Sequence, residues 1–199
     1  MENELIRHYD LLIDENNDPV HDPDPLREYM DLWDGVIFLD ALQLDETKSV
    51  LEIGVGTGRL AIKTAPLCGE FYGIDLSPKT IRRAKENLDH LSNVHLLLGD
   101  FMVAELNESF DVIYSSLTFM HIRDKQGAIT KAAGLLGQSG RFVLSIDKNQ
   151  DRYLDMGTRK LEVYPDTPEE ILRCMERAGL QVVSQAETEL AYIFTAQKV

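Results

Sequence analysis

The sequence of 199 residues predicts an α/β fold: a doubly wound, mostly parallel sheet that is covered by helices on both faces and closed by an antiparallel hairpin. Two observations predict it. From residue 50 onward, short segments that are apolar throughout alternate with segments of helical periodicity, as strands buried on both faces do. Near the end of the chain, two strand-like segments are separated by only a few residues, which is too short for a crossover between parallel strands.

Each expected element rests on a local signal. Apolar runs place strands at 50–54, 70–75, 94–98, 110–115 and 141–146, and the closing hairpin at 181–187 and 191–197. Helical spacing places helices at 58–66, 78–90, 124–136 and 167–178. Two of these helices are preceded by an N-capping hydroxyl and then a proline, at Ser77-Pro78 and Thr167-Pro168.

Residues 1–49 differ in pattern and are expected to form a helical cap, ahead of one globular unit at 50–199. Residues 14–25 are rich in Asp, Asn and Pro, which predicts a break in the cap near 16–24. Afterwards apolar side chains recur at helical spacing, and this favours a core position for Trp33. They are Leu26, Met30, Trp33, Ile37 and Leu42.

Composition limits the partners. The chain has 34 acidic against 20 basic residues, a formal net charge of −14, so we expect no nucleic-acid partner. The first residues are acidic and no apolar run is long enough to span a bilayer, so we expect neither a secretory signal nor a membrane partner. Two cysteines make neither a disulfide framework nor a metal site, and a cytoplasmic protein is expected.

The most informative segment is the run from Val50 to Leu60. An apolar strand ends in three glycines at alternate positions, Gly54, Gly56 and Gly58, and Asp75 follows at the end of the second strand. Glycines there let the backbone approach a ligand closely, and a carboxylate after the second strand suits ribose hydroxyls. The pattern therefore predicts a nucleoside cofactor at the carboxyl end of the sheet. A tight strand-to-helix turn without a ligand is the alternative.

These residues resemble the class I S-adenosylmethionine-dependent methyltransferase family over roughly residues 50–197. The resemblance lies in Glu52-x-Gly54-x-Gly56-x-Gly58, Asp75, Gly99-Asp100-Phe101, Phe110-Asp111-Val112-Ile113 and the terminal hairpin. It implies a Rossmann-like sheet of seven strands with the last strand inserted antiparallel. It also implies S-adenosylmethionine as cofactor and S-adenosylhomocysteine as product.

A nicotinamide dinucleotide is the competing cofactor, which would make the protein an NAD(P)-dependent oxidoreductase. Its fingerprint is G-x-G-x-x-G/A. When this fingerprint is read from Gly54, its third small residue falls on Arg59. The position of Gly58 fits the methyltransferase spacing instead.

The resemblance assigns cofactor contacts to particular residues. Asp75 would bind the ribose, and Leu76 would pack on an adenine face. Asp100 would lie near the adenine amino group, with Phe101 or Met102 close to the ring. Glu52 would organise the glycine loop, Ser115 would lie beneath the methionine part, and Tyr9 would close over the cofactor. The complete expected set is Tyr9, Glu52, Gly54, Val55, Gly56, Gly58, Asp75, Leu76, Asp100, Phe101 and Ser115. Two alternatives stay open: Asp100 as the cap of a turn, and a purely structural Glu52.

His121, shortly after the fourth strand, is the candidate general base, with a structural role in its loop as the alternative. The segment 148–166, which includes Tyr164, either lines the acceptor pocket or is a surface connection.

No appended recognition domain is evident, so the expected acceptor is an O, N or S atom of a small molecule. A catalytically silent S-adenosylmethionine-binding or regulatory protein is the second hypothesis. A monomer or a homodimer is expected.

Overall fold

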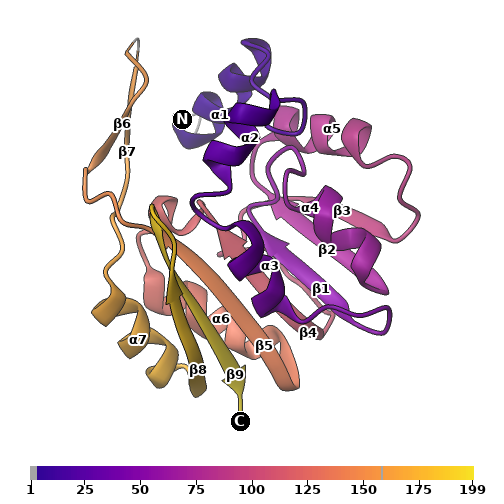
Figure 1. Ribbon diagram of the computed structural model, residues 1–199, viewed down its shortest axis with the longest axis vertical. Helices are drawn as coiled ribbons and strands as arrows, with labels where there is room; N and C mark the ends of the chain where they lie inside the picture. Colours follow the sequence, from indigo (N-terminus) through magenta and orange to yellow (C-terminus); the bar gives the residue numbers. More distant parts are fainter. Residues whose placement is uncertain (1–3, 158) are drawn as a thin grey trace.

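A seven-stranded sheet runs through the middle of the computed structural model, which describes residues 4–157 and 159–199 (Figure 1). The strand order is β3-β2-β1-β4-β5-β9-β8, and β9 is antiparallel to both of its neighbours. The strands of this sheet are β1 Ser49–Ile53, β2 Glu70–Asp75, β3 Val94–Leu98, β4 Phe110–Ser116, β5 Leu136–Asp147, β8 Leu180–Glu187 and β9 Ala191–Lys198. The predicted fold class, including the inserted antiparallel last strand, is confirmed.

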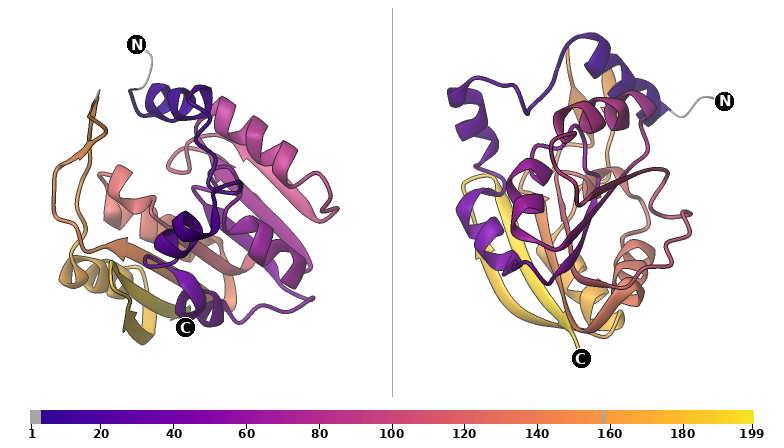
Figure 2. Two further views of the ribbon diagram at one scale, coloured as in Figure 1. Left: turned by 45° about the horizontal axis from the view of Figure 1, so that its top comes forward. Right: turned by 90° about the vertical axis from the view of Figure 1, so that its right-hand side faces the viewer.

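Helices cover both faces of the sheet, as Figure 2 shows from two further directions. The α-helices are α1 Glu4–Asp14, α2 Asp24–Met30, α3 Gly35–Leu42, α4 Ala61–Thr64, α5 Pro78–Asn87, α6 Lys125–Leu135 and α7 Pro168–Arg177. Two 3-10 turns, η1 Ala65–Leu67 and η2 Phe119–His121, complete the helical elements of the described residues. Among those residues no helix is long and apolar enough to cross a membrane.

The alternation of side chains along each central strand divides the core in two. Val50 packs in the cluster that contains Phe38 of α3 and Ala61 of α4. Its neighbour Leu51 packs in the cluster that contains Ile129 of α6, on the opposite face. Because both faces of the strand are apolar, helices are required on both sides.

The helix predicted at 58–66 is shorter than expected. The chain continues a turn through Gly58, whose φ of +99° is incompatible with a helix, and α4 begins only at Ala61. Pro66 then lies in the 3-10 turn η1, since a proline cannot donate the hydrogen bond that would continue an α-helix.

The apolar residues at helical spacing between Leu26 and Leu42 do not share one helix: they lie on α2 and α3, with Trp33 in the turn between the two. Asp34 caps α3 through the amide of Gly35, whose φ is +57°, and this turn separates α2 from α3. Leu42 is fully buried, but Trp33 is only half-buried and Ile37 is 48% exposed. The core position expected for Trp33 is therefore wrong.

A second, two-stranded sheet was not predicted. Strands β6 Tyr153–Asp155 and β7 Lys160–Glu162 form an antiparallel hairpin inside the segment 148–166, and it projects from the main sheet beside α1 (Figure 1). Three polar contacts of Arg159 join it to α1: two with the carboxylate of Glu15, at 2.7 and 2.8 Å, and one with Nδ1 of His8, at 3.2 Å.

The other side of α1 is joined to the start of α5. The carboxylate of Asp10 accepts hydrogen bonds from the Ser77 hydroxyl, at 2.7 Å, and from the Lys79 amide, at 3.1 Å. The ammonium of Lys79 in turn contacts Asp14. Helix α1 thus spans the distance between α5 and the hairpin, above the carboxyl ends of the strands (Figure 2).

Candidate functional site

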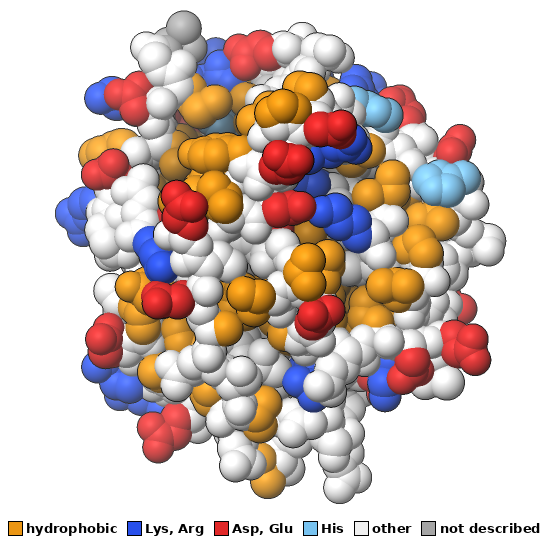
Figure 3. All heavy atoms as spheres, viewed as in Figure 1, with side chains coloured by type: hydrophobic (Ala, Val, Ile, Leu, Met, Phe, Trp, Pro, Cys, Tyr) orange, Lys and Arg blue, Asp and Glu red, His pale blue; other side chains and the backbone are white. Residues whose placement is uncertain are grey.

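A cavity of about 680 Å³ lies at the carboxyl ends of β1, β2, β3 and β4, within the size range of small-molecule sites. Helix α1 covers it, and η2 with the end of β7 forms its far wall. Apolar side chains gather in the upper part of the molecular face in Figure 3, next to the N-terminal helices, with charged groups around them. A cavity in this position is typical of ligand sites in doubly wound folds.

The glycine loop brings bare backbone to this cavity. Gly54 has a φ of +78°, and a Cβ added to it would lie 2.0 Å from Oγ1 of Thr118. Gly56 has a φ of +57°, and a Cβ added to it would meet no atom within 4 Å. Both glycines line the cavity. The first glycine is therefore required by packing, whereas the second leaves open space beside the cavity.

Asp75 fixes the glycine loop through hydrogen bonds to backbone amides. Its carboxylate accepts the amide of Gly56 at 3.0 Å and the amide of Ser77 at 3.0 Å. Burial raises the pKa of Asp75, and these backbone hydrogen bonds oppose that rise. Each oxygen has a second lone pair for a ligand hydroxyl.

Glu52 is buried at the end of β1, at 3% exposure, and lines the same cavity. The Tyr114 hydroxyl donates to its carboxylate at 2.9 Å, and the Thr64 hydroxyl lies 2.8 Å from that of Tyr114. Burial raises the pKa of Glu52 to about 8, since the single hydrogen bond from Tyr114 does not compensate for desolvation. Glu52 therefore carries a proton at neutral pH in the structure as it stands.

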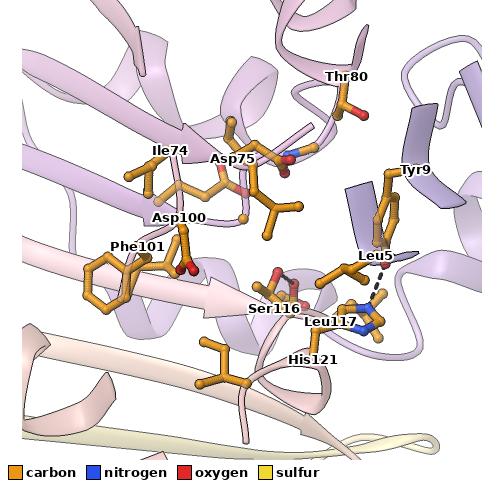
Figure 4. A pocket seen from close by; sticks show the side chains of 18 of the residues that line it. Leu5, Tyr9, Ile74, Asp75, Thr80, Asp100, Phe101, Ser116, Leu117 and His121 are labelled. Atoms are coloured by element: carbon orange, nitrogen blue, oxygen red, sulfur yellow. Dashed lines mark hydrogen bonds between the residues drawn. The ribbon is translucent and has the colours of Figure 1, made fainter. Parts of the chain in front are cut away.

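Asp100 caps the turn after β3, which was the alternative interpretation of this residue. Its Oδ1 accepts the Met102 amide at 2.8 Å. Asp100 also lines the cavity together with Phe101, whose ring is 5% exposed (Figure 4). The capping role and a contact to a ligand are compatible, because the carboxylate has a further oxygen.

His121 and Tyr9 meet across the cavity from Asp75, one from η2 and the other from α1 (Figure 4). The Tyr9 hydroxyl lies 2.6 Å from Nε2 of His121. Burial lowers the pKa of His121 to about 4, assisted by the charges of His8 and Lys125, and burial raises that of Tyr9. At neutral pH the pair is therefore an uncharged imidazole hydrogen bonded to an uncharged phenol.

The cavity brings together ten of the twelve residues singled out in the sequence. They are Tyr9, Glu52, Gly54, Val55, Gly56, Asp75, Leu76, Asp100, Phe101 and His121. The other two, Gly58 and Ser115, are not among its lining residues. Gly58 faces the side chain of Leu88 behind the loop, and the Ser115 hydroxyl donates to the Ile53 carbonyl at 2.9 Å. Their places support the loop and the strand ends from behind.

Sequence reasoning missed several lining residues. Arg59 directly follows the glycine loop, and its guanidinium donates two hydrogen bonds, one to each oxygen of the fully buried carboxylate of Asp34. Leu117 has a φ of +56° at the end of β4, a conformation that no sequence pattern indicated. Tyr164 lay in a segment for which both a pocket and a surface role had been left open, and it lines the cavity. The remaining lining residues not anticipated include Leu5, Arg123 and Leu161.

No group of His, Cys, Asp or Glu that could hold a metal ion occurs in the part of the chain that the structure describes. The two cysteines, Cys68 and Cys174, are buried and separate.

A doubly wound sheet with an inserted antiparallel strand and a glycine-lined cavity at its carboxyl end defines a class of nucleoside-cofactor folds. Within that class, residues 44–194 match the family described as a methyltransferase domain. The chain belongs to this methyltransferase family.

Related proteins agree with this. An uncharacterized methyltransferase of Anoxybacillus flavithermus is 37% identical over 122 residues, which are 59% of this chain and 56% of that protein. The chain thus matches about half the length of its curated relatives.

Solved structures share the fold. One is a SAM-dependent methyltransferase from Aquifex aeolicus, with a TM-score of 0.73 and 19% identity over 92% of this chain and 99% of the other. Another is magnesium protoporphyrin IX methyltransferase from Synechocystis with bound SAH, with a TM-score of 0.65 and 19% identity over 79% and 76% of the two chains.

Proposed function

We propose that this protein transfers a methyl group from S-adenosylmethionine to an oxygen, nitrogen or sulfur atom of a small molecule. The observation that carries the proposal is the geometry around Gly56. Its backbone amide is fixed by Asp75, and the space where a Cβ would stand is open and borders the cavity. The family membership of residues 44–194 supports the same reaction.

The residues present fit the proposed cofactor. In the proposal, Gly54, Val55 and Gly56 approach it with backbone, and Asp75 accepts its ribose hydroxyls. Leu76 and Asp100 would lie against its base. The shared fold of magnesium protoporphyrin IX methyltransferase from Synechocystis, a structure with bound SAH, supports this assignment. Bound S-adenosylmethionine supplies an activated methyl group on a sulfonium centre.

The contribution of the chain is then mainly to position the acceptor and to exclude water, since orientation alone lowers a barrier by several kcal/mol. His121 is our candidate for the group that receives a proton from the acceptor. Its imidazole is neutral at physiological pH and can therefore accept a proton, but the burial that lowers its pKa to about 4 also makes it a weak base. Tyr9 holds Nε2 by a hydrogen bond and so orients the ring.

We further propose that residues 1–49 act as a cap over a catalytic unit at 50–199, as either a monomer or a homodimer. Support for the cap comes from α1, which covers the cavity with Leu5 and Tyr9. A cytoplasmic location stays a prediction.

The test has two parts. Isothermal titration calorimetry should show binding of S-adenosylhomocysteine and no binding of NADH at the same concentrations. Incubation with a metabolite extract and isotopically labelled S-adenosylmethionine should then yield a labelled small molecule by mass spectrometry. Absence of S-adenosylhomocysteine binding would refute the proposal, whereas binding without labelled product would favour the silent binding protein.

A further inference from the structure

The cavity wall formed by α1, η2 and β7 has a chemistry of its own. We name it the acceptor wall and define it as Leu5, His121, Ile122, Arg123, Leu161 and Tyr164, all of which line the cavity. Most of these side chains are apolar or aromatic. The wall lies across the cavity from Asp75 and Asp100, as its labelled members in Figure 4 show.

Arg123 is the unusual member of this wall. Its side chain is exposed, and among the described residues its one interaction is with the ring of Tyr164, whose centroid lies 6.0 Å from the guanidinium carbon. No hydrogen bond or ion pair joins its N–H groups to any described residue. The other arginine in the cavity, Arg59, is instead held on two sides by Asp34.

Two carboxylates near Arg123 in the sequence or in the cavity wall, those of Asp124 and Glu162, do not pair with it. Asp124 accepts the Gly127 amide at 2.8 Å and caps α6. Glu162 and Asp124 both line the cavity, but neither forms an ion pair with Arg123 among the described residues. The fork of donors on Arg123 is therefore free to bind an oxyanion from the cavity.

Hydrogen bonds attach Tyr164, whose ring contacts Arg123, to the neighbouring segments. The Tyr164 amide donates to the Met120 carbonyl at 2.7 Å, and its carbonyl accepts the ammonium of Lys125 at 2.8 Å. The same ammonium donates to the Phe119 carbonyl at 2.6 Å. Tyr164 is therefore connected directly to Met120 and, through Lys125, to Phe119, both in η2, the turn that carries His121.

Lys125 is itself buried, at 5% exposure, and lies 2.9 Å from the buried carboxylate of Asp166. A buried ammonium with three oxygen neighbours has all its donors used, so it fixes the segments that supply those oxygens. These contacts hold the Tyr164 segment against the turn that carries His121.

We infer that the acceptor is a small acid with a flat apolar body, whose carboxylate binds Arg123 while the body packs against Tyr164 and the aliphatic residues of the acceptor wall. A planar guanidinium matches a carboxylate in a two-point contact. Anchoring at Arg123 would present the opposite end of the molecule toward the Tyr9–His121 pair. This inference rests on the proposed methyl transfer, since it assigns the acceptor of that reaction.

The test compares two probes of equal shape, benzoate and benzamide, which differ in charge. Their dissociation constants are measured by NMR titration of the S-adenosylhomocysteine-saturated protein, with the Arg Nε–H resonance of Arg123 as reporter. We expect benzoate to bind at least about tenfold more tightly than benzamide and to shift that resonance. Arg123→Gln should abolish the preference.

Arg173→Gln is the matched control, because Arg173 is an exposed arginine on α7 outside the cavity lining. It should leave the preference for benzoate intact. Equal affinity for the two probes, no binding of benzoate, or a preference that survives in Arg123→Gln would each overturn the inference. Because S-adenosylhomocysteine binding is measured first and separately, failure of the proposed function is recognised before either probe is added.

Discussion

The two sides of the cavity are built in different ways. The side formed by the strand ends presents backbone and carboxylates that follow directly from β1, β2 and β3. The acceptor wall comes from α1, η2 and β7, which lie far apart in the sequence and are joined by side-chain contacts such as Arg159 with Glu15. The side at the strand ends can therefore serve a cofactor shared by many proteins, whereas the acceptor wall is free to vary with the acceptor.

The largest expected effect comes from removing the carboxylate at the end of β2. In Asp75→Ala, two charge-assisted hydrogen bonds to the ribose would be lost, at about 1.5 kcal/mol or more each, so S-adenosylhomocysteine should bind roughly 100-fold more weakly. Calorimetry on the folded variant, checked by circular dichroism, measures this. Asp89→Ala, in a side chain that is 79% exposed on the far end of the α5 segment, is the control and should bind normally.

An affinity in Asp75→Ala within about threefold of the parent protein would contradict the assignment of this carboxylate. Asp75→Asn serves as a second variant: its one side-chain oxygen can keep only one of the two backbone hydrogen bonds, so it removes the charge and loosens the loop less than alanine does.

The glycine loop offers a comparison between packing and binding. Gly54→Ala should destabilise the fold by about 3 kcal/mol, because the added methyl group meets Thr118 and the residue keeps a positive φ. Gly56→Ala carries only the backbone strain, about 1–2 kcal/mol, but its methyl group enters the open space beside the cavity. Urea unfolding measures the first effect, and titration with S-adenosylhomocysteine measures the second.

Equal destabilisation by the two substitutions, with cofactor affinity unchanged in Gly56→Ala, would show that the space beside Gly56 is not used by the ligand. Gly134→Ala in α6 is a suitable control, since an added Cβ there also meets open space and the residue has no positive φ.

Glu52 predicts a pH dependence of stability. Its pKa in the folded protein, about 8, lies above the ordinary glutamate value of 4.5, so between these two pH values the folded state holds a proton that the unfolded state has released. This contribution is fully present below pH 4.5 and is lost as the pH rises toward and through 8, by up to about 1.4 kcal/mol per pH unit. Glu52→Gln should remove this slope.

Urea unfolding of both proteins at pH 5.5, 7 and 8.5 checks it. The parent protein should lose stability relative to Glu52→Gln as the pH rises. Parallel stability curves would mean that Glu52 is ionised in the folded state, and its hydrogen bond from Tyr114 would then outweigh its burial.

The smallest effect is expected on the outer side of the acceptor wall. Arg159→Gln removes the surface ion pair of the hairpin with Glu15 and one 3.2 Å hydrogen bond to the buried His8, so global stability should change little. Hydrogen exchange should accelerate in α1 and β7 but not in the glycine loop. Lys160→Gln is the control on the same strand, because Lys160 pairs with Asp155 inside the hairpin. Faster exchange throughout the cavity would contradict the independence of its two sides.

The sequence predicted the strand-end side well and the acceptor wall poorly, for a physical reason. Gly54, Gly56 and Asp75 follow strands whose apolar runs are local signals, and parallel strand ends meet at one edge of a sheet. Tyr164 and Arg123 meet because the Tyr164 amide bonds to the Met120 carbonyl and Lys125 joins the two segments through two further carbonyls. Such contacts between distant segments leave no periodic pattern.

The same reason explains the hairpin β6–β7. Its strands have three residues each, Tyr153–Asp155 and Lys160–Glu162, too short for a recognisable alternation. His121 was found because a histidine after the fourth strand is conspicuous, but its partner in the hydrogen bond, Tyr9, lies 112 positions away.

The proposed methyl transfer depends most on what binds in the cavity beneath α1. A crystal structure of the protein with S-adenosylhomocysteine tests this directly. We expect the ligand to lie between the glycine loop and Asp100. Its ribose hydroxyls should contact the carboxylate of Asp75, and its sulfur should point toward the Tyr9–His121 pair. Ligand density at another place, or none at saturating concentration, would contradict it.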